Sequence, residues 1–316
     1  MNGTRWMGLL WLGASGCATG PSDTDRAVPG DEGPGGTPWS DAGPTSSGDP
    51  NVVPQQGPWT DFDKAVAVGV LCGITVDGAI DCPLADLRRI DLPDGVFTDV
   101  RITGGAGLAG CGLEASGELA CFDAIAGSRV VTETPEGRFI AVAGHSFTYA
   151  HACGVGEDGH AVCWGEGIES DPPDDVFGPE LSGWNNTWCG LLEDQTLSCW
   201  ETSGAGSAEV IDGAPEGAWD SVVVGDDYAC AMRGTSVTCW GDIPGDDPPD
   251  ESLLSVGPGE SNICGVRPDQ TGVCWGTNGW GQLAVPEGEF TKILPGREQV
   301  CGLRVSGIVE CWGLQM

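Results

Sequence analysis

The residues whose chemistry follows most directly from the sequence are its fifteen cysteines. Fourteen of them occur in pairs at regular spacing. Six pairs are ten residues apart and one is nine apart. The sequence pairs Cys72 with Cys82, Cys111 with Cys121, Cys153 with Cys163, Cys189 with Cys199, Cys230 with Cys239, Cys264 with Cys274, and Cys301 with Cys311. Paired cysteines form disulfides or bind a metal such as zinc. Structural zinc sites place their close cysteines about two to four residues apart, so the longer spacing favours disulfides.

The segment between the two cysteines of a pair has the pattern of a β-hairpin. Its midpoint carries residue pairs such as Asp77-Gly78, Ser116-Gly117 and Asp158-Gly159. These pairs indicate a hairpin turn, because Asp tolerates tight turns and Gly supplies a positive φ. Two residues equidistant from such a turn lie opposite each other on adjacent antiparallel strands, within reach of a disulfide. The sequence therefore predicts seven cross-strand disulfides, each stabilising the fold by about 2–3 kcal/mol.

A second motif precedes the hairpins, and each copy leads into a short apolar strand. Its near copies are Pro93-Asp94-Gly95-Val96-Phe97, Pro135-Glu136-Gly137-Arg138-Phe139, Pro215-Glu216-Gly217-Ala218-Trp219 and Pro286-Glu287-Gly288-Glu289-Phe290. A repeat of about 38 residues with several short strands indicates a propeller or a solenoid. Radial closure protects the edges of the strands. We therefore predict an all-β, seven-bladed β-propeller.

One repeat carries a longer motif that resembles a known family. Cys264-Gly265-Val266 is followed by Cys274-Trp275-Gly276, and then by Thr277-Asn278-Gly279-Trp280-Gly281-Gln282-Leu283. This pattern resembles the regulator of chromosome condensation repeat family, and the resemblance covers residues 52–316. It implies a seven-bladed propeller, in agreement with the count of cysteine pairs.

The N-terminal part of the chain has the pattern of an exported lipoprotein. Residues 1–16 read as a signal peptide, with a short apolar run that ends in small residues before Cys17. Cys17 resembles the lipidated cysteine of a bacterial lipoprotein, and Ala18 after it is typical of sorting to the outer membrane; a plain signal peptide is the alternative. Residues 17–50 are rich in Gly, Pro, Ser and Asp and predict a disordered tether. Residues 51–316 would form the propeller.

The chain ends directly after the seventh hairpin, without the strand that enters a further blade. Val52-Val53 resembles Ala284-Val285, the segment that enters the last blade. We therefore predict that Val52-Val53 supplies a strand to that blade and latches the ring.

The composition narrows the functional classes. A net charge of −34 with only thirteen Lys and Arg repels nucleic acid and anionic lipid, so membrane contact is expected only through the N-terminal lipid. No catalytic motif, metal site or cofactor site is predicted, and the chain is not expected to be an enzyme. The alternative hypothesis among enzymes is a metal-dependent envelope enzyme that uses His145, His151 and Asp226 or Asp227.

Three loops between the first and second strands of consecutive repeats carry unusual aromatic residues. They span 144–152, 183–188 and 225–228, and their candidate binding residues are Phe147, Tyr149, His151, Trp184, Trp188 and Tyr228. Aromatic clusters on loops are typical of recognition surfaces; the alternative is that these side chains are packing groups. We expect a monomeric module that binds a protein or a glycan through this face. The second hypothesis is a structural or adhesion component without a discrete site.

Overall fold

The structure is a computed structural model, and it describes residues 58–64, 71–83, 91–103, 109–123, 129–144, 150–245 and 248–314. The predicted signal peptide, the lipidated Cys17, the tether and the Val52-Val53 latch lie outside the described residues. Those four expectations therefore stay predictions.

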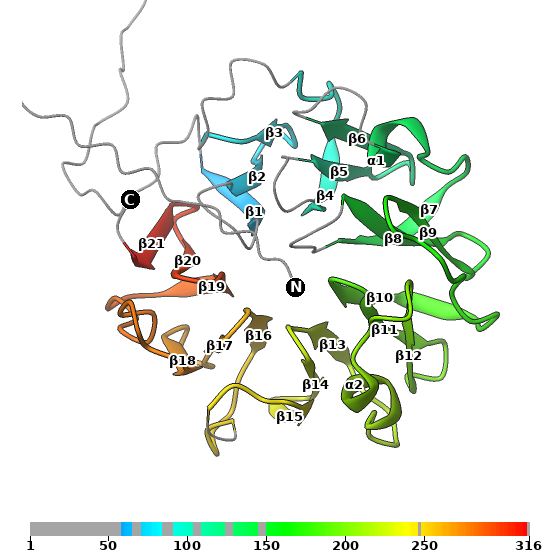
Figure 1. The fold of residues 1–316 in the computed structure, drawn as a ribbon. Coiled ribbons are helices and arrows are strands. Elements are labelled where there is room, and N and C mark those ends of the chain that lie inside the picture. Colours follow the sequence, from blue (N-terminus) through cyan, green and yellow to red (C-terminus); the bar gives the residue numbers. More distant parts are fainter. Residues whose placement is uncertain are drawn as a thin grey trace, which may run out of the picture. The chain divides into compact units, whose positions relative to one another are not determined.

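The described strands form seven three-stranded antiparallel sheets, arranged as the blades of a propeller (Figure 1). The innermost strands are β1 (Trp59–Lys64), β4 (Phe97–Ile102), β7 (Phe139–Ala143), β10 (Phe177–Trp184), β13 (Ser221–Val224), β16 (Ser255–Pro258) and β19 (Phe290–Pro295). The middle strands are β2 (Leu71–Thr75), β5 (Ala109–Glu114), β8 (His151–Gly156), β11 (Thr187–Leu192), β14 (Tyr228–Arg233), β17 (Asn262–Val266) and β20 (Gln299–Arg304). The predicted fold class is confirmed.

The outer strands complete the blades in chain order. They are β3 (Ile80–Asp81), β6 (Leu119–Asp123), β9 (Ala161–Gly165), β12 (Leu197–Glu201), β15 (Ser236–Gly241), β18 (Gly272–Gly276) and β21 (Val309–Gly313). Two short helices, α1 (Arg129–Thr132) and α2 (Ala208–Asp212), lie between blades. Within the described ranges, no helix has the length and apolar character needed to cross a membrane.

All seven predicted disulfides are present, one in each blade. They join Cys72 to Cys82, Cys111 to Cys121, Cys153 to Cys163, Cys189 to Cys199, Cys230 to Cys239, Cys264 to Cys274, and Cys301 to Cys311. The Cα atoms of each pair lie 3.9–4.2 Å apart.

Six of these disulfides link the middle strand of a blade to its outer strand, between direct partners in the strand register. The partners in blades 2 to 7 are Cys111 and Cys121, Cys153 and Cys163, Cys189 and Cys199, Cys230 and Cys239, Cys264 and Cys274, and Cys301 and Cys311. In blade 1 the outer strand is shorter, and Cys82 is the residue just after it. Equal distance from the hairpin turn therefore places the two sulfur atoms together, as the spacing predicts.

In blades 3, 4 and 7, the repeated motifs of the sequence meet in one packing unit. In blade 4, the ring of Phe177 lies 5.3 Å from the ring of Trp200, centroid to centroid. Phe177 also contacts Gly190, where an added Cβ atom would come within 2.8 Å of the ring. The glycine after the first cysteine therefore makes room for the aromatic residue that begins the innermost strand. The tryptophan after the second cysteine covers that same ring.

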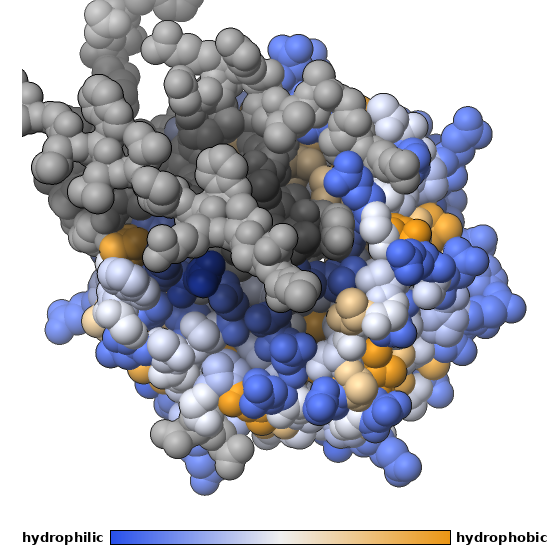
Figure 2. Space-filling model, viewed as in Figure 1, coloured by the Kyte–Doolittle hydropathy of each residue, from blue (hydrophilic) through white to orange (hydrophobic). Residues whose placement is uncertain are grey.

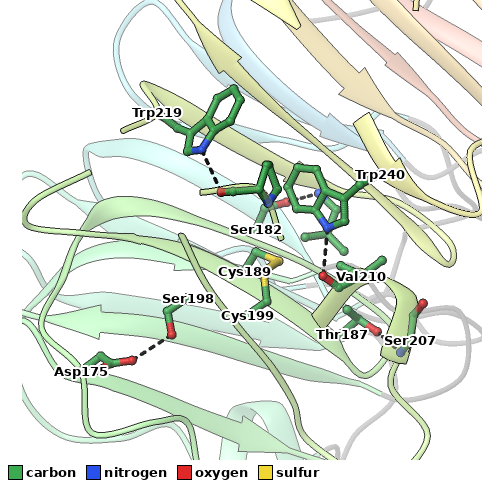
Figure 3. The surroundings of a disulfide bond; sticks show 12 residues. Asp175, Ser182, Thr187, Cys189, Ser198, Cys199, Ser207, Val210, Trp219 and Trp240 are labelled. Atoms are coloured by element: carbon green, nitrogen blue, oxygen red, sulfur yellow. Dashed lines mark hydrogen bonds between the residues drawn. A yellow bond between two sulfur atoms is a disulfide. The ribbon is translucent and has the colours of Figure 1, made fainter. Parts of the chain in front are cut away.

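Neighbouring blades bury their middle strands between them. At the interface of blades 4 and 5, Cys189 packs in one apolar cluster with Trp219 and Trp240. Figure 3 shows the disulfide between Cys189 and Cys199 beside these two indoles, with the Trp240 Nε1–H donating to the carbonyl of Val210 at 2.9 Å. The disulfides thus lie within the apolar layers between blades and contribute buried surface as well as a covalent link.

The two ends of the propeller are distinct. We call the end with the middle-to-outer hairpin turns, such as Asp77-Gly78, the turn face. The opposite end carries the links from innermost to middle strands, such as Asn185-Asn186, and we call it the loop face. On the turn face, the backbone N–H of the first buried residue of each repeat donates to a turn carbonyl of a neighbouring blade. The seven pairs are Phe97–Gly78, Phe139–Gly117, Phe177–Gly159, Trp219–Gln195, Leu253–Thr235, Phe290–Gln270 and Trp59–Gly307, at 2.8–2.9 Å.

The last of these bonds, between Trp59 and Gly307, joins blade 1 to blade 7 and closes the ring. On the innermost strands of the same two blades, Lys292 Nζ lies 2.8 Å from Asp61 Oδ1. It also donates to the Phe62 carbonyl at 2.9 Å. Blade 7 has three strands of its own, like the other six, so the described residues close the ring by blade-to-blade packing.

Candidate functional site

The structure places the sequence-predicted binding residues in two groups. Phe147 and Tyr149, together with His145, lie outside the described residues. The other four are described, and all are buried: His151, Trp188 and Tyr228 are 0% exposed and Trp184 is 2% exposed. This corrects the expected picture for these four side chains, which do not form an exposed aromatic patch on the loop face.

His151 is held between two blades. Its Nδ1 lies 3.1 Å from the carbonyl oxygen of Glu166, and its Nε2 forms a short hydrogen bond with the carbonyl of Asn185 on the next blade. Burial lowers the pKa of His151, and the hydrogen bonds to the two carbonyls oppose that shift. His151 therefore acts as a clamp that fixes the Asn185-Asn186 turn of blade 4.

Trp188 is part of the same clamp. Its ring centroid lies 5.7 Å from that of His151, and its Nε1–H donates to the hydroxyl of Thr202 at 3.3 Å. An added Cβ at Gly183 would come within 2.2 Å of the Trp188 ring. The indole therefore lies directly over the strand that leads to the Asn185-Asn186 turn, and it supports the turn from inside.

Tyr228 makes the corresponding contact between blades 5 and 6. Its hydroxyl donates to the carbonyl of Gly259 at 2.9 Å and accepts from the N–H of the same residue at 2.9 Å. Burial raises the pKa of Tyr228, so the hydroxyl stays protonated and keeps its role as donor. Tyr228 is thus a structural residue, which agrees with the packing alternative considered for it.

What the loop face presents instead is a polar pocket between blades 4 and 5. Its volume is about 260 Å³, and it is lined by Trp184, Asn185, Asn186, Thr187, Ala205, Asp226 and Asp227. The lining comes from the turn between β10 and β11, from the turn between β13 and β14, and from the segment after β12. Two of the three loops singled out in the sequence therefore meet at this pocket, through their polar side chains.

The two turns are tied to each other and to their own blades. Asn185 Nδ2 donates to Asp226 Oδ1 at 3.2 Å, across the interface. The carbonyl of Asn186 accepts from the Thr202 N–H at 3.0 Å, and the carbonyl of Asp227 accepts from the Asp242 N–H at 2.8 Å. The pocket is consequently built on fixed backbone.

The backbone of both turns passes through the left-handed region. Asn185 has φ 50° and Asp227 has φ 62°. Asn and Asp are the side chains that tolerate this conformation best among non-glycine residues. Asn185-Asn186 is a two-residue hairpin loop, flanked by the register pair Trp184 and Thr187, and such loops favour a positive φ. The sequence thus shapes the rim of the pocket with residues that also carry polar groups.

The electrostatics of the pocket are set by its two carboxylates. Burial, together with the neighbouring charge of Asp227, raises the pKa of Asp226, while hydrogen bonds from Trp184 and Asn185 oppose that shift. The Oδ1 atom of Asn186 is buried and accepts no hydrogen bond within the described chain. None of the described residues that line the pocket is a Lys, Arg or His. The pocket therefore offers one buried acceptor, Asn186 Oδ1, that the described chain does not satisfy.

The hypothesis of a metal-dependent enzyme depends on side chains that could hold a metal ion. The described residues contain no group of three or more His, Cys, Asp or Glu side chains placed to hold a metal ion. The rival enzyme hypothesis relied on His145, His151 and Asp226 or Asp227. His145 lies outside the described residues, and the buried His151 is engaged by the carbonyls of Glu166 and Asn185.

The sequence identified both loops as candidate binding loops, but the residues selected in them were aromatic rather than polar. Asn185, Asn186 and Thr187 were not among the candidates, and the two aspartates appeared only in the rival metal hypothesis. A usable signal was present: Asn185-Asn186 and Asp226-Asp227 are paired turn residues at the loop-face ends of consecutive repeats. Polar pairs of this kind indicate turns, and turns at one end of a propeller converge on one face.

No family model matches the sequence. Solved structures are similar to the chain at low identity. The CRINKLY WD40 ectodomain of the Arabidopsis thaliana receptor kinase ACR4 is 24% identical, with a TM-score of 0.65, over 82% of this chain and 97% of that one. The ectodomain of the Physcomitrella patens receptor kinase CR4 is 23% identical, with a TM-score of 0.65, over 81% of this chain and 73% of that one.

A third similar structure connects the fold to the resemblance noted in the sequence. Prp20p from Saccharomyces cerevisiae, which is yeast RCC1, is 11% identical, with a TM-score of 0.54, over 84% of this chain and 83% of that one. At these identities the similarities establish the fold alone, a seven-bladed β-propeller. Seven disulfides fit an oxidising compartment outside the cytosol.

Proposed function

We propose that this protein is a binding module that engages a partner protein through its loop face, with the pocket between blades 4 and 5 at the centre of the contact. The observation that carries the proposal is the acceptor-rich pocket on fixed turns, with Asp226, Asp227 and the unpartnered Asn186 Oδ1 of the described chain. Prp20p, which has the same type of fold, binds Gsp1p and histones, so propellers of this type can serve as binding scaffolds.

The chemistry of the pocket favours a basic side chain of the partner. Two adjacent carboxylates and a neutral amide oxygen accept hydrogen bonds, and the described lining residues contain no cation that neutralises them. A Lys or Arg of the partner would supply donors and offset the burial and the neighbouring charge that raise the pKa of Asp226. The overall charge of −34 would also speed the encounter with a basic surface.

We place the module in a bacterial envelope as a lipoprotein, anchored through Cys17 and held away from the outer membrane by residues 17–50. The support is the residue pattern of the N-terminus together with the oxidised propeller that follows it. Metabolic labelling with a fatty-acid analogue tests this part. The expected result is label on the native protein and none on Cys17→Ser, whereas equal label on both would contradict it.

Capture from envelope extracts tests the binding proposal. The baits are the native protein, an Asp226→Asn/Asp227→Asn variant that keeps the shape of the pocket, and a Glu216→Gln/Glu287→Gln control. The control removes the same charge from exposed positions near the turn face. A partner held by the native and control baits, and released by the pocket variant or by salt, supports the proposal.

Other outcomes of the same capture point elsewhere. A partner held equally by all three baits would place the contact away from the pocket. A glycan retained by the native bait and insensitive to salt would replace the protein partner, because sugar hydroxyls also satisfy amide and carboxylate acceptors. No retained molecule on any bait would favour a structural or adhesion component without a discrete site.

A further inference from the structure

A second cavity lies on the axis of the propeller, and of its lining residues only Trp184 also lines the loop-face pocket. The described residues enclose about 200 Å³ between the innermost strands. Hydrophilic residues gather around the hollow at the centre of the ring (Figure 2). Charged and apolar side chains both line this cavity, including Arg101, Glu180 and Lys292 on one hand and Val223, Val256 and Leu294 on the other.

The charges of the channel come mainly from blades 7, 1 and 2, and most of them have partners. Lys292 pairs with Asp61 at 2.8 Å. Arg101 pairs with Asp99 at 3.0 Å. The Ile102 N–H donates to the Asp63 carboxylate at 2.7 Å, which joins blades 1 and 2. The Lys292–Asp61 pair connects blades 7 and 1, whereas Arg101 and Asp99 lie on the same strand, β4.

The carboxylates in and beside the channel outnumber the cations there. Asp63 and Glu180 line the cavity together with Arg101 and Lys292. Asp99 and Asp61 are not lining residues, but they pair with these two cations, so Asp63 and Glu180 are left without a cation of their own. The Oδ1 atom of Asp99 is buried and has no hydrogen-bond partner in the described chain. Glu180 lines the channel from blade 4. It takes part in none of the ion pairs described above.

The pKa values of two channel carboxylates are raised in these surroundings. Burial, together with the charges of Asp61 and Asp63, raises the pKa of Asp99, although Arg101 opposes that shift. Burial and the charge of Asp99 also raise the pKa of Glu180, with Arg101 again opposing. Glu180 is open to channel water but enclosed by the surrounding strands, which is why its ionised form is disfavoured. A bound cation would reverse this penalty for both groups.

Two features decide the kind of cation. The described carboxylates do not converge in a group of three or more that could hold a metal ion. The lining also includes apolar side chains such as Val223, Val256 and Leu294. An extended cation with an apolar stem therefore matches the cavity better than a compact inorganic ion.

We infer that the axial cavity binds a small organic amine, whose ammonium group is held by Glu180 and whose apolar stem lies against Val223, Val256 and Leu294. Neutral acceptors and carboxylates satisfy the N–H donors of an ammonium, and the apolar stem removes hydrocarbon from water. The site uses residues of the innermost strands, and its occupant need not touch the partner of the loop face.

Calorimetric titration of the purified protein with 1,5-diaminopentane tests this inference. The expected result is saturable binding at one site, weakened at least tenfold by Glu180→Gln. Glu287→Gln, at an exposed position near the turn face, is the matched control for general attraction of a cation to an acidic protein, and it should bind as the native protein does. Pentanoate, an anion with a stem of similar length, should not bind.

A second variant keeps the test decisive if Glu180→Gln alters the fold. Val223→Phe fills part of the cavity and leaves every channel charge in place, so it should also weaken binding. Equal binding by the native protein, Glu180→Gln and Val223→Phe would overturn the inference. The absence of saturable heat with the native protein would do so as well, and pentanoate binding as tight as that of the diamine would assign recognition to Arg101 instead.

Discussion

The side-chain amide of Asn185, on blade 4, donates a hydrogen bond of 3.2 Å to the carboxylate of Asp226, on blade 5. The two residues are 41 positions apart in the sequence, and each occupies a turn on the loop face. Their contact fixes the mouth of the polar pocket and connects two blades at the same time. It is therefore both a structural bond and part of the proposed site.

A double-mutant cycle measures this contact. Asn185→Gly is chosen because φ is positive at this position, so that glycine adds no strain, and Asp226→Ala removes the acceptor. We expect a coupling energy of about 0.5–1.5 kcal/mol between the two changes. Chemical denaturation of the four proteins, with disulfides intact, gives the value. Strict additivity would mean that the bond contributes nothing to stability.

The His151 clamp predicts a pH dependence with a defined sign. Burial lowers the pKa of His151 in the folded protein, whereas an unfolded histidine titrates near about 6.5. The unfolded chain therefore takes up a proton first as the pH falls, and the folded state loses stability below about pH 6.5. The contribution is fully present above that value.

His151→Gln removes this titration. The difference in unfolding free energy between the native protein and His151→Gln should shrink as the pH falls from about 7.5 to about 5.5, across the unfolded pKa. His160→Gln, at an exposed imidazole, reports the effect of removing a histidine outside the core. A difference between native and His151→Gln that stays constant over this range would contradict the assignment of a buried neutral imidazole.

The aromatic packing unit predicts that the glycine after the first cysteine cannot be enlarged. In Gly190→Ala, the new Cβ would lie 2.8 Å from the ring of Phe177, and overpacking of this kind costs about 1–3 kcal/mol. Gly178→Ala is the matched control in the same blade, since its Cβ would meet nothing closer than 3.6 Å. Denaturation midpoints of the two variants should separate clearly, and similar midpoints would refute the packing argument.

The hairpin turns offer a stabilising change. Gln270 has φ 67° at a turn position where other repeats have glycine, such as Gly159 with φ 81°. A non-glycine residue in the left-handed region costs about 1–2 kcal/mol, and the entropy of glycine offsets about 0.5–1 kcal/mol of that. Gln270→Gly should therefore raise stability by about 0.5 kcal/mol. Gly159→Ala should lower it, and thermal unfolding that ranks them otherwise would count against this account of the turns.

The fold was readable from the sequence because its signals are local and repeated. The distance from each cysteine to its turn fixes the disulfide, and seven copies of the spacing fix the number of blades. The contact between Gly190 and Phe177 explains why two motifs that lie apart in each repeat recur together.

The site was less readable, because its contacts cross between repeats. His151 and Tyr228 precede their cysteines by two residues, and a sequence shows an aromatic residue there without showing that its polar atom reaches the next blade. Asn185 and Asp226 belong to different repeats, and only the ring geometry brings them together. The described aromatic residues are buried between blades, so they do not have the surface role that was expected of them.

Site-specific photocrosslinking in the producing cells tests the central claim most directly. A photoreactive amino acid is placed at Ala205, an exposed residue at the pocket on the loop face, or at Val96, which is 64% exposed at the turn face. We expect a crosslinked partner from position 205, none from position 96, and loss of the crosslink when Asp226→Asn/Asp227→Asn is added. A partner captured from position 96, or from position 205 regardless of the two aspartates, would contradict it.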